Sequence, residues 1–262
     1  MIKNMLKFLL VGCITMAAST PAWSADTLQD ILSAGKVRIG VLSDAAPWGF
    51  KGADGSLQGL DIDLSKQLAK EMGVKLELVQ VTGASRIPSL LSNKVDMLIA
   101  AAGATPQRAL QVMFSQPYAA VDLGVYGGPK MQEAKVAADL KGDTIAVAKG
   151  TTLDVWLTDH AKGAKIMRFE DTPSAIKAYL SGQAQSFAEN SAIAKKVNED
   201  NPNSHTELKF LIRQSPAHAM VAQGQQNLLN WINTFLFSQR MSGELSGLQA
   251  KWFGKAQTLP LM

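Results

Sequence analysis

Residues 60–81 read LDIDLSKQLAKEMGVKLELVQV and change hydrophobic period at a single glycine. In residues 60–73, leucine or methionine recurs at every fourth position, which predicts an amphipathic helix that ends at Gly73. In residues 74–81, apolar and polar side chains alternate, which predicts a strand. The stretch therefore predicts a helix followed by a strand, the repeating unit of an α/β fold.

The same alternation extends to both sides of this stretch and restarts in the second half of the chain. It predicts a mostly parallel sheet with helices on both faces, arranged as two units that each have a small-residue turn at the carboxyl end of a strand. The expected elements are strands at 36–42, 95–101, 164–171 and 184–190, a strand running into a helix at 143–152, extended segments at 208–216 and 218–224, and helices at 86–93, 173–182, 191–200, 228–243 and 244–254.

The first 25 residues have the layout of a secretory signal peptide. Lys3 and Lys7 precede the apolar run FLLVGCITMAA, and small residues follow it. We expect cleavage after Ser24 or after Ala25. An alternative is a lipoprotein signal, in which Cys13 at the end of the motif LVGC would carry the lipid anchor. The apolar stretch before Cys13 is short for such a signal. No later run approaches the roughly 18 apolar residues of a membrane-spanning helix.

Composition argues against several classes of function. Removing Lys3 and Lys7 with the leader lowers the net charge from +4 to +2, and the remaining basic residues are scattered, so nucleic-acid binding gains no support. The three histidines lie far apart, and Cys13 is the one cysteine. The sequence therefore predicts neither a metal site nor a cofactor site.

Residues 95–108, VDMLIAAAGATPQR, end on an arginine in an unusual place. Pro106 fits the first position of a helix, with Thr105 as its N-cap, so Arg108 falls in the first turn. The helix dipole already presents positive charge there, and a cation gains nothing from it. The position makes sense if a negative group lies in front of Arg108.

Two turns in the sequence lead from the carboxyl end of a strand into the start of a helix: AAGATPQR and KGTTLD. In open α/β sheets, ligands bind at the carboxyl ends of strands, and two units facing each other would form a cleft between them. Helix amides favour an anion at such a place, and the fork of Arg108 suits a carboxylate. The alternative is that Arg108 is a solvated surface arginine and that Thr151 or Thr152 is a plain N-cap.

Taken in order, several stretches resemble the periplasmic substrate-binding proteins of ABC transporters, in the family that binds polar amino acids. The similarity covers nearly the whole chain after the leader. The stretches are KVRIGVLSDAAPWGF, LQGLDIDLSKQLAKEMGV, ASRIPSLLSNKVDMLIA, ATPQRALQVMFSQPY, DLKGDTIAVAKGTT and QAKWFG.

The resemblance implies a two-lobed protein of the type II periplasmic-binding topology. Lobe 1 would comprise residues 26–120 and 217–262, lobe 2 residues 124–211, and the hinges would lie near 119–124 and 211–217. Such a protein closes on an amino acid or small carboxylate by hinge bending and presents it to a membrane permease. It works as a monomer and catalyses no reaction.

The resemblance also implies roles for individual residues. The clamp for the ligand carboxylate falls on Arg108, helped by backbone amides around Gly103 and Thr105. Asp44 and Trp48 would line the wall of lobe 1, with Trp48 a candidate lid unless it is a core aromatic, and Arg86 would face the cleft unless it is a surface charge. Hydroxyl and amide contacts from lobe 2 fall on Gly150, Thr151 and Thr152.

The sequence departs from the family at two places in the expected site. Ala100, Ala101 and Gly103 stand where relatives usually offer hydroxyls, and Asn190 stands where an aspartate commonly accepts the ligand ammonium. Either the adjacent Glu189 is the anionic partner of an α-amino acid, or the ligand is a carboxylate without a free ammonium that contacts the amide of Asn190.

An enzymatic alternative rests on Glu189. The resemblance extends to periplasmic dehydratases of the cyclohexadienyl type, in which a carboxylic acid in a desolvated cleft would donate a proton. Asp61 and Asp63 form an acidic pair two residues apart, but their spacing does not place them on one helical face. We interpret them as residues at the start of a helix.

Overall fold

The structure is a computed structural model and describes residues 26–131 and 134–259. The expected signal peptide, its cleavage site and the alternative anchor at Cys13 lie outside the described residues. Within the described ranges, no helix is long and apolar enough to cross a membrane.

Helices and strands alternate along most of the chain, with nearly the bounds expected from the sequence. The helices are α1 (Thr27–Ala34), α2 (Leu60–Met72), α3 (Arg86–Leu91), α4 (Pro106–Ala109), α5 (Thr152–His160), α6 (Thr172–Leu180), α7 (Ser191–Asp200), α8 (Gln226–Met241) and α9 (Glu244–Phe253). The strands are β1 (Lys36–Leu42), β2 (Asp44–Ala45), β3 (Gly49–Lys51), β4 (Leu57–Gln58), β5 (Lys75–Val81), β6 (Met97–Ala102), β7 (Val112–Gly127), β8 (Thr144–Ala148), β9 (Lys165–Phe169), β10 (Ser186–Asn190) and β11 (Glu207–Ala222). Helix α1, strands β2–β4 and the full length of β7 were not expected.

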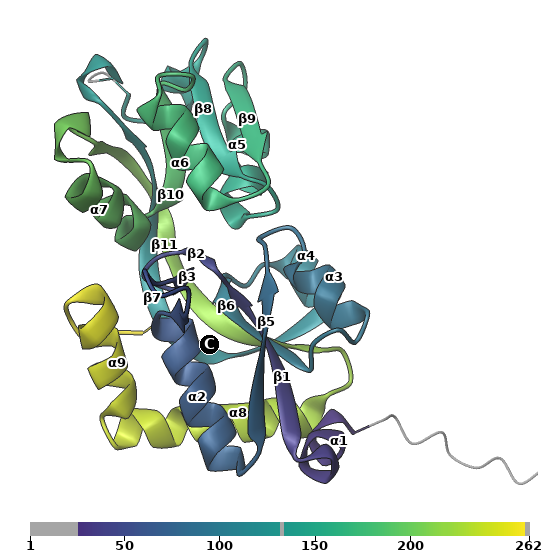
Figure 1. The fold of residues 1–262 in the computed structure, drawn as a ribbon. Helices are drawn as coiled ribbons and strands as arrows, with labels where there is room; N and C mark the ends of the chain where they lie inside the picture. Colours follow the sequence, from purple (N-terminus) through teal and green to yellow (C-terminus); the bar gives the residue numbers. More distant parts are fainter. Residues whose placement is uncertain (1–25, 132–133, 260–262) are drawn as a thin grey trace, which may run out of the picture.

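Eight strands form one continuous sheet in the order β5-β1-β6-β11-β7-β10-β8-β9, and the short strands β2, β3 and β4 form a separate sheet. Lobe 1 contains β1, β5 and β6, and lobe 2 contains β8, β9 and β10, with helices around each group (Figure 1). The strands within each group are parallel, whereas β7 and β11 are antiparallel to each other. The sheet is therefore mixed rather than mostly parallel, because the chain crosses to lobe 2 along β7 and returns along β11.

The antiparallel pair of β7 and β11 is the connection between the lobes (Figure 1). The two segments predicted as hinges, 119–124 and 211–217, lie opposite each other in this pair, with Ala119 beside Ala217 and Gly124 beside Leu211. The register between them is irregular on both sides.

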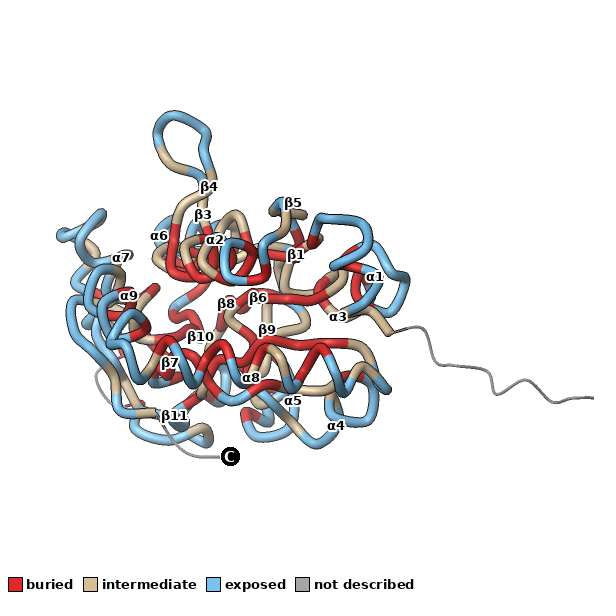
Figure 2. Tube along the Cα trace, turned by 90° about the horizontal axis from the view of Figure 1, so that it is seen from below, coloured by how far each residue is buried: buried red, intermediate tan, exposed pale blue. Residues whose placement is uncertain are grey.

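The core of lobe 1 explains why residues 60–81 are decisive for the fold. Leu60, Leu64 and Leu68 of α2 are at most 1% exposed and pack on the sheet. Gly73 ends α2 in the left-handed conformation, as predicted. Seen from below, the buried residues follow β1, β6 and β7 and the inner side of α8 (Figure 2). Burial of this face holds the strand ends of the cleft in place.

Gly59, just before α2, allows two backbones to approach closely. It has a φ of +127°, and a Cβ at this position would lie 2.1 Å from the carbonyl oxygen of Trp48. Only glycine fits such a contact. The turn that carries Asp44 and Trp48 is thereby fixed against the start of α2.

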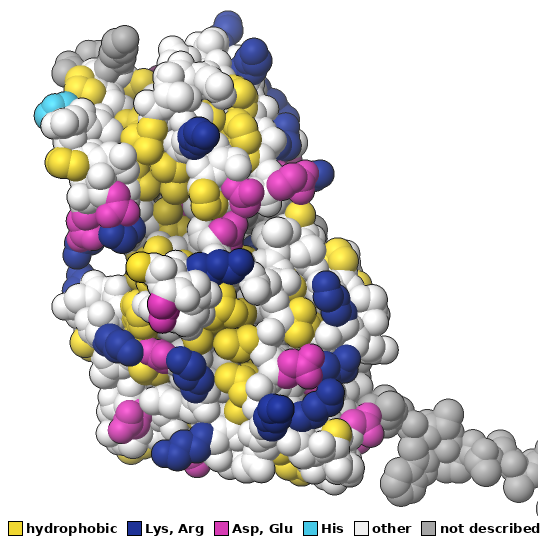
Figure 3. Space-filling view, in the orientation of Figure 1, with side chains coloured by type: hydrophobic (Ala, Val, Ile, Leu, Met, Phe, Trp, Pro, Cys, Tyr) yellow, Lys and Arg dark blue, Asp and Glu magenta, His cyan; other side chains and the backbone are white. Residues whose placement is uncertain are grey.

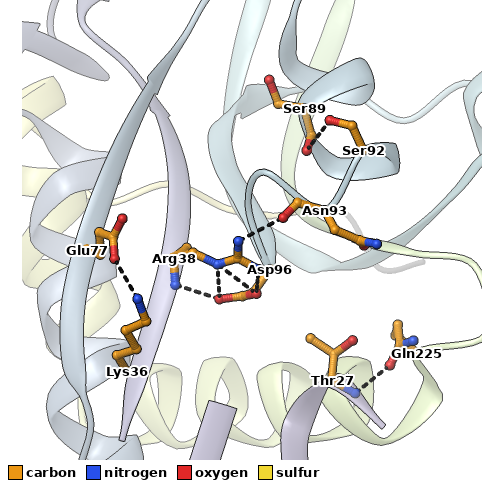
Figure 4. Close-up of polar contacts among 9 residues, drawn as sticks. All are labelled: Thr27, Lys36, Arg38, Glu77, Ser89, Ser92, Asn93, Asp96 and Gln225. Carbon is orange, nitrogen blue, oxygen red and sulfur yellow. Dashed lines mark hydrogen bonds and ion pairs between the residues drawn. The ribbon is translucent and has the colours of Figure 1, made fainter. Parts of the chain in front are cut away.

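A polar cluster on the outer side of lobe 1 joins β1 to the turn before β6 (Figure 4). The guanidinium of Arg38 donates to both carboxylate oxygens of Asp96, and its Nη1 donates to the carbonyl oxygen of Asn93 at 2.8 Å. The backbone N–H of Arg38 also donates to Asp96, at 2.7 Å. These bonds anchor the beginning of β6, whose other end forms the floor of the cleft.

Candidate ligand-binding cleft

A cleft lies between the two lobes. Lobe 1 contributes β2, α3 and the β6–α4 turn, and lobe 2 contributes the β8–α5 turn, the beginning of α6 and the end of β10. Acidic side chains gather on the edge of lobe 2 that faces lobe 1 (Figure 3). The predicted ligand residues that line the cleft are Asp44, Trp48, Arg86, Ala101, Gly103, Arg108, Thr151, Thr152, Glu189 and Asn190.

The other two predicted residues, Thr105 and Gly150, act through Arg108 instead of lining the cleft. Thr105 caps α4 by accepting a hydrogen bond from the backbone N–H of Arg108 at 3.2 Å, and Pro106 is the first helical residue, as predicted. Helix α4 has four residues, so its dipole is small. Thr105 therefore contributes mainly by orienting Arg108, and the dipole of α4 adds little positive charge.

The guanidinium of Arg108 reaches across the cleft. Its Nη1 donates to the carbonyl oxygen of Gly103 at 2.8 Å, and its Nη2 donates to that of Gly150, in lobe 2, at 2.9 Å. Burial lowers the pKa of Arg108 to about 10, helped by the charges of Arg86 and Arg213. It stays protonated at neutral pH. Among the described residues, no carboxylate forms an ion pair with it.

The lobes touch through small residues beside this arginine. A Cβ on Gly150 would lie 2.9 Å from the Cα of Ala84, and a Cβ on Gly83 would lie 3.1 Å from the carbonyl oxygen of Lys149. Gly150 also has a φ of +72°, which favours glycine. The backbones of the two lobes therefore meet directly, and the structure represents a closed arrangement.

Arg86 is a buried residue of lobe 1, 5% exposed, and not a surface charge. Its Nη1 donates to the carbonyl oxygens of Ala100 and Ala101, at 2.5 and 3.3 Å, and its Nε donates to that of Gly83 at 3.3 Å. Burial lowers the pKa of Arg86. The residue holds the end of β6 against the loop that touches lobe 2.

Asp61 and Tyr118 form a buried polar pair beneath the same strand end. The hydroxyl of Tyr118 donates to Oδ1 of Asp61 at 2.8 Å and accepts from the backbone N–H of Ala101 at 3.1 Å. Burial raises the pKa of Asp61 to about 7. Asp61 does stand in the first turn of α2, as interpreted from the sequence, but it also supports the cleft floor, a role that the sequence analysis missed.

Ala101 is held in an uncommon backbone conformation, with a φ of +49°. Its N–H bonds to Tyr118 and its carbonyl oxygen to Arg86. A non-glycine residue at positive φ persists where its surroundings enforce it. Ala101 offers no side-chain hydroxyl to a ligand, but Tyr118 and Arg86 hold its backbone in place from below the cleft.

Glu189 and Asn190 form the lobe 2 wall opposite the arginines. Oε1 of Glu189 accepts from the backbone N–H of Asn190 at 2.7 Å and from its side-chain Nδ2 at 2.9 Å. Oε2 lies 3.5 Å from the hydroxyl of Thr172. Burial raises the pKa of Glu189 to about 7, while the bonds from Asn190 act in the opposite direction. Near neutral pH, Glu189 is therefore poised between its acid and carboxylate forms.

Asp44 closes the mouth of the cleft against α6. Burial raises its pKa, the charge of Asp171 raises it further, and the backbone N–H of Thr172 lowers it. Asp171 caps α6 by accepting from the N–H of Ser174 at 2.7 Å. Asp171 and Thr172 were not expected in the cleft, although an Asp-Thr-Pro sequence does signal a helix start.

Trp48 lies in the wall of the cleft and not over it. It is 1% exposed, and its ring contacts the rings of Tyr118 and Phe253 edge to face, with centroids 6.4 and 4.9 Å away. These contacts fix it within the core of lobe 1, so the expectation of a lid is wrong.

Within the described ranges, no group of three histidine, cysteine, aspartate or glutamate side chains could hold a metal ion.

Two α/β lobes joined by two strands, with a charged cleft between them, define a type II periplasmic binding protein. The model of the bacterial extracellular solute-binding proteins, family 3, matches residues 37–255. The chain belongs to this family. The predicted class, a solute-binding component of an ABC importer for an amino acid or related small carboxylate, is confirmed.

Individual relatives match over most of their length. The chain is 27% identical to the L-cystine-binding protein TcyJ of Escherichia coli (strain K12), over 87% of this chain and 86% of that protein. The solved structure of a solute receptor for L-cysteine of Neisseria gonorrhoeae is 32% identical, with a TM-score of 0.80 over 86% of this chain and 92% of that chain. An ancestral amino acid-binding protein, AncCDT-1, described as a precursor of cyclohexadienyl dehydratase, is also 32% identical, with a TM-score of 0.80 over 87% and 99%.

Replacing Gly83 with valine is expected to hold the lobes apart, because even its Cβ would press on the carbonyl oxygen of Lys149. We expect roughly a tenfold or greater loss of ligand affinity by calorimetry, with little change in the melting temperature of the ligand-free protein. Gly247→Val is the matched control, because a Cβ there meets open space on α9. Equal affinities of Gly83→Val and the control would contradict this role of the small-residue contact.

Proposed function

We propose that the protein binds a zwitterionic α-amino acid, whose carboxylate contacts Arg108 and whose ammonium contacts Glu189. The observation that carries this proposal is the separation of charge across the cleft. A partly buried guanidinium without a carboxylate partner among the described residues belongs to lobe 1, and a buried carboxyl group belongs to lobe 2. A zwitterion would satisfy both groups and would favour the closed state over the open one.

The bonds of Asn190 favour Glu189 over Asn190 as the acceptor for a ligand ammonium. Its side-chain oxygen already accepts from the backbone N–H groups of Ala192 and Ile193, both at 3.1 Å. It is therefore not a free acceptor for a ligand. Oε2 of Glu189, whose nearest hydroxyl is 3.5 Å away, is the acceptor that a ligand ammonium would reach.

A second candidate function, a periplasmic dehydratase with Glu189 as general acid, is favoured by one observation. Burial raises the pKa of Glu189 to about 7, so the group carries a proton part of the time at neutral pH. We nevertheless propose a binding protein without catalytic activity, because two donors from Asn190 stabilise the carboxylate form. Consumption of prephenate or arogenate by the purified protein would overturn this choice.

We further propose that the protein acts as a monomer in the periplasm after removal of the leader, and that both lobes contact the permease in the closed form. The layout of the first 25 residues supports export. The contact between the lobes at Gly83, Ala84 and Gly150 supports the proposed permease contact, because the surface that spans both lobes exists in the closed form alone.

The function is tested by identifying the ligand. We expect mass spectrometry of gently purified protein to detect a bound amino acid, and a thermal-shift screen of the 20 common L-amino acids, L-cystine and small carboxylates to give the largest increase in melting temperature with that compound. A ligand present at 100 times its Kd stabilises the folded state by about 2.7 kcal/mol. Stabilisation by carboxylates that lack an amino group, and by no amino acid, would contradict the proposal.

A further inference from the structure

Asn190 uses both ends of its side-chain amide within the protein. Nδ2 donates to Oε1 of Glu189 at 2.9 Å, and Oδ1 accepts from two backbone N–H groups at the start of α7. Its backbone N–H donates to the same Oε1 at 2.7 Å. The residue is 7% exposed. Asn190 therefore connects the N-terminus of a ten-residue helix directly to the buried carboxyl group.

We propose that Asn190 is a positioning residue for the ammonium site. Asn190 holds the carboxyl group of Glu189 in place and at the same time caps α7. This inference rests on the proposed function, in which Glu189 accepts the ligand ammonium. In this arrangement, Glu189 and Asn190 together take the role of the single aspartate that commonly accepts the ligand ammonium in the family. Glu189 supplies the charge, and Asn190 fixes its direction.

The direction of the hydrogen bonds explains why an asparagine occupies this position. The amide nitrogen is a donor toward Glu189, and the amide oxygen is an acceptor toward α7, so one side chain satisfies two groups of opposite polarity. An aspartate would keep the cap but would place a second acceptor 2.9 Å from Oε1, where two carboxylates repel each other. With Oε1 held by two donors, Oε2 is the oxygen left to face the cleft.

Other charged or titratable groups also surround Glu189. Asp44 on β2 raises the pKa of Glu189, Arg86 on α3 interacts with it favourably, and Tyr126 on β7 has a raised pKa, mainly through burial and also through the charge of Glu189. Among the described residues, none of these groups forms a hydrogen bond with Glu189. Asn190 and Thr172 are the partners that orient it.

Asn190→Ser tests the proposal, because serine keeps the helix cap but removes the donor to Glu189. The readout is the titration of Glu189 in ligand-free protein labelled with ¹³C at glutamate carboxyls, with the Glu189 signal assigned by its loss in Glu189→Gln. We expect the titration midpoint to move to higher pH in Asn190→Ser and further in Asn190→Asp. Asn227→Ser, an exposed change elsewhere, should leave it unmoved.

Binding gives the second readout, with the amino acid that produces the largest thermal shift as probe. We expect Asn190→Ser to bind it roughly tenfold more weakly at pH 7 and to approach the unmodified protein above pH 8, where Glu189 ionises in both. An unmoved midpoint in both Asn190 variants, or a loss of affinity that is the same at every pH, would overturn the positioning role. If Glu189→Gln binds the probe as well as the unmodified protein does, the assignment of the ammonium to Glu189 fails, while the ¹³C titration still tests the link between Asn190 and Glu189.

Discussion

Arg108→Ala is expected to abolish ligand binding and to leave the fold intact. The guanidinium contacts only backbone carbonyl oxygens among the described residues, so its removal breaks no ion pair within the protein. In the complex, by contrast, the variant leaves a buried ligand carboxylate without its charged partner. We expect a loss of roughly 3–5 kcal/mol, which is about 150- to 5,000-fold in Kd.

The measurement is isothermal calorimetry, with circular dichroism and thermal melting to establish that the variant is folded. Arg108→Lys should recover part of the affinity, since a lysine supplies the charge but not the bidentate fork. Arg213→Ala is the matched control, because Arg213 is an exposed arginine close enough to lower the pKa of Arg108. Equal losses in Arg108→Ala and Arg213→Ala would indicate general positive potential in place of a clamp.

Glu189→Gln is expected to have the second-largest effect. The substitution keeps the shape of the side chain and removes the charge that the proposed ligand ammonium contacts. We expect affinity for α-amino acids to fall about 10- to 150-fold at pH 8, corresponding to the roughly 1.5–3 kcal/mol of a hydrogen bond to a charged group. Affinity for the same carboxylate skeleton without the amino group should change little.

The pH dependence of binding provides a sharper test of Glu189. Burial raises the pKa of Glu189 to about 7, and a ligand ammonium favours the carboxylate form. Binding should therefore release a proton, so affinity should rise between pH 6 and pH 8 and fall as the pH drops below 7. Asp61 titrates in the same range, with its pKa raised to about 7 by burial. Loss of the pH dependence in Glu189→Gln assigns it to Glu189, and its persistence there would assign it elsewhere.

The sequence predicted those parts of the fold that depend on local periodicity and caps. The four-residue spacing of leucines gave α2, Gly73 gave its end, and Thr105 with Pro106 gave the start of α4. These features depend on neighbours within about one helical turn, which a single sequence displays. The site residues were placed mainly through the family resemblance, and most of them do line one cleft.

Contacts between distant segments could not be predicted in this way. Asp61 and Tyr118 are 57 positions apart in the sequence, and nothing near Asp61 indicates that its carboxyl group would be buried beneath Ala101. Trp48 was ambiguous for the same reason, because its partners Tyr118 and Phe253 come from β7 and α9. Asn190 was predicted as a ligand residue, and it does line the cleft, but its role as the cap of α7 depends on backbone geometry and was not predicted.

The central claim is that one zwitterion joins Arg108 of lobe 1 to Glu189 of lobe 2. The most direct test is a crystal structure of the protein with the amino acid that purifies with it or stabilises it most. We predict hydrogen bonds from the Arg108 guanidinium to the ligand carboxylate, a bond from the ligand ammonium to Glu189 and Asn190 still bound to Oε1 of Glu189. A ligand whose carboxylate lies away from Arg108, or whose ammonium has its acceptor in another part of the cleft, would contradict the account.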